Sequence, residues 1–408
     1  MGAPSAFPVT EPPRHPAPRL ERRERLEALA WLWAAVGPEC PPPPAPPPAL
    51  WRDLPTLAEG HGLAALALTA ARAGTTGLDG QALEGLARLE DAAARTVARG
   101  RRLAEEQAAL DAALDRAELP GVWLKGSWLS GEAVYPDPLL RPRADLDLYL
   151  PEARWGRAAT VLEGLGYRPA QRSWKHAVWL SADHQVVDLR GEHPANPRPV
   201  ELHPHLGEGF RGLRLDLDAD APRPPARRLS PGVALTHLAA HATVSMLERR
   251  LRLLQLLDLA LLGRRLAPAD EATAATIGSR PGAARFLWPS LALTARLSPS
   301  PALQRLVAAL ETGVAAPLRR WLDAQDLDLL SWPGRGDARR PLLEIPAIWP
   351  TGAAEQATVW RAILAPPPEL LADRYPELAA EGRRKAMVLR HLGFTIRQAA
   401  YRWRQRPR

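Results

Sequence analysis

The spacing of apolar residues separates helical from non-helical stretches of the chain. Between residues 51 and 118, leucines, alanines and valines recur three, four or seven positions apart, which is typical of amphipathic helices. A shorter helical stretch covers residues 20–36, and the prolines of residues 41–48 follow it as a polyproline II spacer. The helical period returns at Pro231 and continues towards the C-terminus. The pattern therefore predicts helical regions on both sides of a different central unit.

The central unit is characterised by short apolar runs. They predict strands at residues 121–124, 145–150, 176–180, 185–189 and 200–203, and helices at residues 127–134 and 152–165. This order is that of a small α/β unit. We therefore expect a flexible Pro-rich segment with one short helix at residues 1–50, an N-terminal helical domain at 51–119, the α/β core at 120–215 and a C-terminal helical domain at 230–408.

Composition narrows the class of protein. A chain of 408 residues with 46% hydrophobic residues can bury a core, so general disorder is excluded. Cys40 is the only cysteine, which excludes an internal disulfide and a thiolate metal cluster. With neither a secretory signal pattern nor a transmembrane segment, we expect a cytoplasmic protein. The net charge of +8 comes mostly from arginines interspersed with acids and leucines, a pattern typical of solvated helix faces that argues against nucleic acid as a partner.

Two aspartates stand at alternate positions of a predicted strand. Asp145 and Asp147 project to the same face, while Leu146 and Leu148 point to the core. Two carboxylates held this close repel each other unless a cation lies between them. Mg²⁺ prefers such hard oxygen ligands and often keeps substrate phosphates in its other positions. The pair therefore predicts a magnesium site.

A Lys125-Gly126-Ser127 turn lies between the first predicted strand and the helix after it. Unpaired backbone N–H groups at such a turn can hold phosphate, glycine allows a close approach, and the Ser127 hydroxyl adds a donor. Lys125 either contacts phosphate or pairs with a nearby acid. A third carboxylate on a neighbouring strand would complete a two-metal site, and both Glu201 and Asp188 have the required apolar neighbours.

These elements together resemble a known family. The sequence from Leu124 to Pro169, followed by VELHPHL at residues 200–206, is similar to uncharacterised bacterial nucleotidyltransferases of the DNA polymerase β superfold. The shared elements are the lysine-glycine turn, a loop with Tyr and Arg, the D-x-D pair, a Gly-Tyr pair and a Glu-x-His strand. The resemblance implies an α+β fold, with a small mixed-sheet core between N-terminal and C-terminal helical domains.

The resemblance also implies a reaction. It implies transfer of a nucleoside monophosphate from an NTP to an acceptor with release of pyrophosphate, using two Mg²⁺ ions on Asp145 and Asp147. It favours Glu201 as third carboxylate and implies phosphate contacts from Gly126 and Ser127. Residues 188–199 resemble an insertion before the Glu201 strand, so Asp188 stays an alternative to Glu201 as the third carboxylate. The alternative function is a non-catalytic module that senses nucleotide or binds a partner on the same fold.

Several further residues have two interpretations. Arg141 and Arg143 either reach the NTP phosphates or lie solvated in a surface loop. The alternating residues Glu201, His203 and His205 allow a zinc site, although Pro204 opposes convergence of their side chains, and His203 is better placed to orient the acceptor.

The helical regions also contain residues with two interpretations. His237 and His241 share a helix face that lies either in the core or at a cleft, and Asp258 needs a partner such as His241 or an arginine. The basic segment 383–408 either docks on its own helices or binds an anionic membrane.

The acceptor has no motif in this sequence. The helical regions would build its pocket, and their pattern is compatible with a small molecule such as a sugar or an antibiotic, a peptide, a protein side chain or an RNA end. The identity of the NTP base is equally open.

Overall fold

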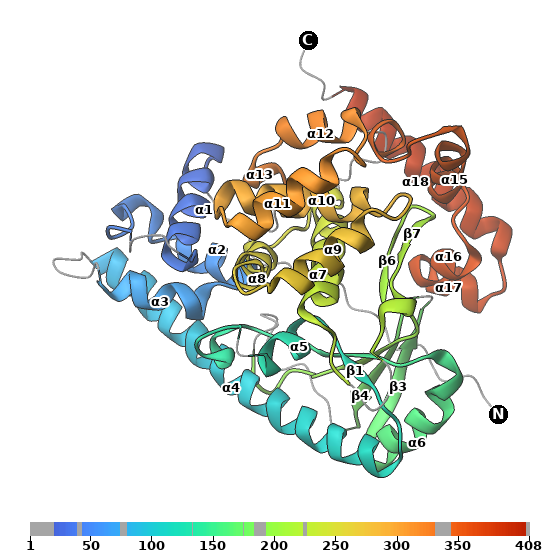
Figure 1. The fold of residues 1–408 in the computed structure, drawn as a ribbon, viewed down its shortest axis with the longest axis horizontal. Coiled ribbons are helices and arrows are strands. Elements are labelled where there is room, and N and C mark those ends of the chain that lie inside the picture. Colours follow the sequence, from blue (N-terminus) through green and yellow to red (C-terminus); the bar gives the residue numbers. More distant parts are fainter. Residues whose placement is uncertain are drawn as a thin grey trace.

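The computed structural model describes residues 20–38, 43–73, 80–132, 134–173, 175–182, 193–222, 227–330 and 344–404. It has the predicted α+β class, with a small mixed sheet enclosed by helices (Figure 1). The strands are β1 (Val122–Trp123), β2 (Leu146–Tyr149), β3 (Tyr167–Arg172), β4 (Ala177–Ser181), β5 (Val200–His203), β6 (Gly207–Phe210) and β7 (Leu213–Asp216).

The main sheet has the order β1-β2-β5-β4-β3. Its β2 and β5 run parallel at the centre, and the other pairs are antiparallel. Both central strands are short and apolar at alternate positions, so Leu146, Leu148, Val200 and Leu202 bury one face. Strands β6 and β7 form a separate hairpin. The polar side chains of β2 and β5 therefore emerge together on the other face of the sheet.

The helix α4 connects two hydrophobic cores. Its second half contributes Leu103, Leu110 and Leu114 to the core beneath the sheet, while Leu89 packs in a larger helical core. Figure 1 shows α4 running along one side of the molecule from the first helices to α6. The helices up to the end of the sheet are α1 (Arg22–Val36), α2 (Leu54–His61), α3 (Ala64–Ala73), α4 (Gly80–Arg116), α5 (Lys125–Gly131) and α6 (Trp155–Gly164).

The larger core joins the N-terminal helices to those after the sheet. Leu29 of α1 and Leu54 of α2 belong to the same buried cluster as Leu235 and Leu256. The two predicted helical regions thus share one apolar interior around α7 and α8. The later helices are α7 (Pro231–Leu247), α8 (Leu253–Gly263), α9 (Pro268–Gly278), α10 (Ala284–Leu297), α11 (Pro301–Glu311), α12 (Ala316–Asp323), α13 (Leu327–Leu330), α14 (Ile345–Ile348), α15 (Ala353–Leu364), α16 (Pro368–Arg374), α17 (Pro376–Ala380) and α18 (Arg384–Arg404).

The basic C-terminal helix docks on its own chain. Helix α18 packs against α15, α16 and α17, with Met387 in a small core beside Leu371 and Tyr375. The Arg374 guanidinium lies 4.1 Å from the centre of the Phe394 ring. The helix is docked through Met387, while Leu389 and Ile396 stay exposed, so binding to an anionic membrane stays a prediction. Within the described ranges, we find no helix with the length and apolar character needed to cross a bilayer.

Strand β3 of the main sheet and the separate hairpin β6–β7 were not predicted. Strand β3 is an edge strand with mostly exposed side chains and a proline, so its sequence lacks an apolar alternation. The hairpin β6–β7 begins with the glycine-rich sequence Gly-Glu-Gly-Phe, which has weak strand propensity. The predicted strand at residues 185–189, with Asp188, lies outside the described residues.

Candidate active site

The two central strands bring three carboxylates together. Asp147 of β2 and Glu201 of β5 are direct partners in the parallel register, and Asp145 directly precedes β2. One oxygen from each of the three side chains lies within 4.8 Å of the others. The predicted metal ligands Asp145, Asp147 and Glu201 therefore converge, which is the arrangement that a divalent cation requires.

The electrostatics of this cluster fit a cation. Burial and the neighbouring Asp147 raise the pKa of Asp145 to about 7. Burial, together with Asp145 and Asp147, raises the pKa of Glu201 to about 8. Lys125 opposes both of these shifts, and with its single charge the three groups are still not all ionised at neutral pH without further positive charge. A divalent cation supplies that charge, so the donor set fits the predicted Mg²⁺.

Lys125 pairs with the central aspartate. Its Nζ lies 2.8 Å from Asp147 Oδ1, and its backbone adopts a left-handed φ of 45°, which is uncommon for a residue with a side chain. Burial opposes the charge on Lys125, but the attraction of Asp147 and the other acids is stronger and raises its pKa. Burial likewise opposes ionisation of Asp147, but Lys125 and His203 lower its pKa. The pair is therefore an ion pair within the site, with Asp147 buried and Lys125 partly buried.

Gly126 and Ser127 form the first turn of α5. A side chain on Gly126 would lie 2.5 Å from Arg141 Nη1, so this position has no room for one. The Ser127 hydroxyl is buried, and no hydrogen-bond partner for it occurs among the described residues. A buried hydroxyl without a partner is rare in folded proteins, and a bound group is one way to satisfy it.

The two predicted phosphate arginines lie beneath this turn. Arg141 donates to both oxygens of Asp258, from Nε at 2.8 Å and from Nη2 at 2.6 Å, and Tyr135 donates to the same carboxylate at 2.6 Å. Arg143 donates to Gln107 Oε1 at 2.9 Å and to the Gly100 carbonyl at 3.2 Å. Both guanidinium groups are thus buried and bound by protein atoms. A direct contact with NTP stays a prediction for both residues.

Arg99 holds the loops that lead into the site. It lies on α4 and donates to five backbone carbonyls, those of Arg143, Ala144, His193, Asn196 and Pro197. The first two precede Asp145, and the other three precede β5. Its charge also favours the ionised form of Asp145. The position of Asp145 and Glu201 therefore depends on a residue that no sequence motif marks.

Histidines complete the cluster. His203 Nε2 donates to Asp147 Oδ1 at 2.8 Å, and His176 Nδ1 lies 3.3 Å from Glu201 Oε2. His205, by contrast, binds Asp218 at 2.8 Å. His176 was missed because only the antiparallel register of β4 on β5 places it across from His203. The sequence contains the residue but gives no pairing.

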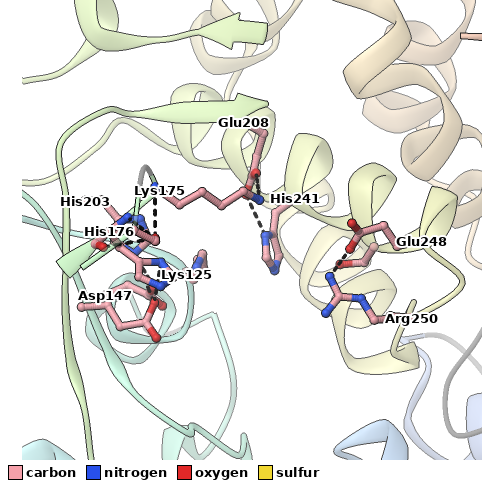
Figure 2. A network of polar contacts seen from close by, with 12 residues as sticks. Lys125, Asp147, Lys175, His176, His203, Glu208, His241, Glu248 and Arg250 are labelled. Carbon is pink, nitrogen blue, oxygen red and sulfur yellow. Dashed lines mark hydrogen bonds and ion pairs between the residues drawn. The ribbon is translucent and has the colours of Figure 1, made fainter. Parts of the chain in front are cut away.

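A small cavity of about 140 Å³ adjoins Glu201, Lys125 and His203. Its far side holds Glu208 of the β6–β7 hairpin, which accepts a hydrogen bond from His241 Nδ1 at 2.8 Å. Figure 2 shows His176, His203, Lys125 and Asp147 on one side of this network, His241 and Glu208 on the other, and Lys175 reaching from the first group towards Glu208.

The two histidines of α7 lie at this cavity, and so at a cleft. His237 is buried, and neither ring nitrogen has a partner in the part of the chain that the structure describes. Burial lowers its pKa to about 3, so the ring is neutral. Asp258, for which His241 was one predicted partner, takes Arg141 instead. His241 therefore lines the cavity and binds Glu208.

Comparison with known proteins gives the family. No curated protein matches the chain. A similar solved structure is that of the antibiotic-resistance factor ANT(2'')-Ia, at 18% identity over 42% of this chain and 89% of that chain, with a TM-score of 0.29. The model of a family described as uncharacterised nucleotidyltransferase matches residues 47–299, more than half of the 408 residues and all of the site. The chain therefore belongs to this family of uncharacterised nucleotidyltransferases.

Proposed function

We propose that the protein is a Mg²⁺-dependent enzyme that moves a nucleoside monophosphate from an NTP to an acceptor and releases pyrophosphate. The observation that carries the proposal is the convergence of Asp145, Asp147 and Glu201 within 4.8 Å, inside the segment that matches the family. Their raised and lowered pKa values support the same conclusion, because strongly perturbed carboxylates concentrate at functional sites.

The three carboxylates would hold two Mg²⁺ ions. Bound Mg²⁺ neutralises phosphate charge and steadies the attacking and leaving oxygens of the displacement. Lys125 keeps Asp147 ionised and so ready as a ligand. Glu201, whose pKa is raised to about 8, would serve either as the third ligand or as the base for an acceptor hydroxyl.

The turn at the start of α5 would hold the triphosphate. Gly126 offers a close backbone approach, and the Ser127 hydroxyl lacks a partner among the residues described. Arg141 and Arg143 would act from beneath the turn, where their charge favours an anion. This division gives each predicted residue a role that its position supports.

The acceptor would enter from the cavity side. The cavity lies between Glu201 and the Glu208–His241 pair, so it suits a polar acceptor group that forms hydrogen bonds. A small molecule, a peptide and a protein side chain all carry such groups.

Two experiments test the proposal. Calorimetry with each NTP and Mg²⁺ measures binding, and incubation of the protein with α-³²P-labelled NTP and cell lysate identifies a labelled acceptor. We expect binding of at least one NTP, and label on an acceptor together with pyrophosphate. Tight binding with neither label transfer nor pyrophosphate would refute the enzyme and support a nucleotide-sensing module.

A further inference from the structure

We propose that His176, Glu201 and His203 form a cation site of their own, selective for a transition-metal ion, beside the all-carboxylate site and sharing Glu201 with it. His176 Nδ1 lies 3.3 Å from Glu201 Oε2, and His203 Nε2 lies 3.7 Å from the same oxygen. All three donor atoms are within 4.8 Å of one another. The proposal depends on these side chains and not on nucleotide transfer.

The distances fit one ion with nitrogen and oxygen ligands. Zinc-type ions bind imidazole nitrogen and carboxylate oxygen at about 2.0–2.2 Å, so ligand atoms in a tetrahedral site are roughly 3.3–3.5 Å apart. The two distances to Glu201 are close to this separation. His203 Nε2 donates a hydrogen bond to Asp147 Oδ1 at 2.8 Å, and it would bind an ion in the tautomer that carries the ring proton on Nδ1.

The strand pairing makes the arrangement stable. Strand β4 pairs antiparallel with β5, with Ala177 opposite Leu202, which brings His176 across from His203. The two rings meet edge to face with centroids 5.5 Å apart. The side chains of His176, Glu201 and His203 are 26%, 17% and 12% exposed. The site is therefore built on a rigid sheet and remains open to water or substrate.

The two sites differ in the ions that they select. Asp145, Asp147 and Glu201 offer only oxygen, which suits Mg²⁺. Two imidazoles and one carboxylate suit Zn²⁺, Co²⁺ or Mn²⁺, because imidazole nitrogen binds these ions better than it binds Mg²⁺. Mg²⁺ alone would fill the carboxylate site and leave the histidine site to another metal.

Cobalt absorption gives a direct test. The full-length protein is stripped with EDTA, dialysed and titrated with Co²⁺ in the presence of excess Mg²⁺, and the visible absorption of four- or five-coordinate Co²⁺ is recorded. We expect a saturable band in the wild type. His176→Gln, which keeps a side chain of similar size, should weaken Co²⁺ binding at least about 10-fold.

Two matched variants control for effects outside the proposed site. His205→Gln makes the same chemical change at a nearby histidine that binds Asp218 instead of the site, and it should leave Co²⁺ binding unchanged. Asp145→Asn should keep the cobalt band, because Asp145 belongs only to the carboxylate site. Circular dichroism checks that each variant is folded.

The outcomes separate this site from the proposed reaction. Equal Co²⁺ affinity and spectrum in His176→Gln and wild type would overturn the histidine site, as would loss of the band in Asp145→Asn or displacement of Co²⁺ by Mg²⁺. A cobalt band without nucleotide transfer would leave this site standing and refute only the proposed function.

Discussion

Arg141 allows a sharp test of what the buried arginine beneath the Lys125–Ser127 turn does. Arg141→Met removes both hydrogen bonds to Asp258 and keeps most of the side-chain volume. Asp258, whose side chain is 2% exposed, would keep among the described residues only the bond from Tyr135. An unpaired carboxylate in such a position is strongly unfavourable.

The expected loss is large. Breaking one partner of a buried ion pair costs about 3–5 kcal/mol of unfolding free energy. Urea denaturation followed by tryptophan fluorescence measures it, and the 14 tryptophans of the chain give a strong signal. We expect Arg141→Met to lower stability by this amount, and a triple variant with Asp258→Leu and Tyr135→Phe to recover most of it, since no buried polar group is then left alone.

A contrary result is easy to recognise. In that case Arg141→Met would change the unfolding free energy by less than about 1 kcal/mol and weaken NTP binding more than about tenfold, a loss of roughly 1.4 kcal/mol of binding free energy. That result would mean that the main role of Arg141 is to bind phosphate. The role assigned to its ion pair with Asp258 would then be wrong.

Three further predictions concern residues around the site and the core. Arg99→Met should lower the unfolding free energy by more than about 3 kcal/mol, because five backbone carbonyls lose a charged donor. A urea midpoint equal to that of the wild type would contradict this prediction. Burial, with Arg252 adding to it, lowers the pKa of His61 to about 3, below the unfolded value of about 6.5. The stabilising contribution of neutral His61 is therefore complete above about pH 6.5 and is lost as the pH falls towards 3. His61→Gln should make the unfolding free energy depend less steeply on pH between these two values. The same slope in this variant and in the wild type would contradict the prediction. Gly207→Ala should lower the unfolding free energy by about 1–3 kcal/mol, because the φ of Gly207 is 142° and the new methyl carbon would collide with the Leu215 carbonyl. Gly164→Ala has open space for its methyl group and serves as the control in the same urea titration. Equal midpoints for the two variants would contradict the prediction.

The three converging carboxylates could be predicted from the sequence because their signal is local. Asp145 and Asp147 lie two apart at one strand, and strand alternation alone places them on one face. The resemblance to the family added Glu201, and the parallel register of β2 and β5 brings it beside Asp147. For these residues, short-range pattern and the family motif were sufficient.

The other site residues depend on contacts between distant segments. His176 reaches the site through the register of β4 on β5, and Glu208 through a glycine-rich hairpin without strand pattern. Arg99 is one of many arginines in its helix, and only the fold shows that it binds loop carbonyls. Asp258 needed a partner by burial, but the sequence offered several arginines as candidates. These contacts join residues far apart in the chain, and the local patterns of a single sequence do not show which distant residues meet.

In the proposed reaction, Asp145 and Asp147 hold the ions that transfer requires. The most direct measurement is pyrophosphate release from NTP by the wild type and by the double variant Asp145→Asn with Asp147→Asn, at saturating Mg²⁺ and with the same acceptor-containing lysate. We predict release by the wild type and none above background by the double variant, with both proteins folded by circular dichroism. Equal release by the two proteins would contradict the claim.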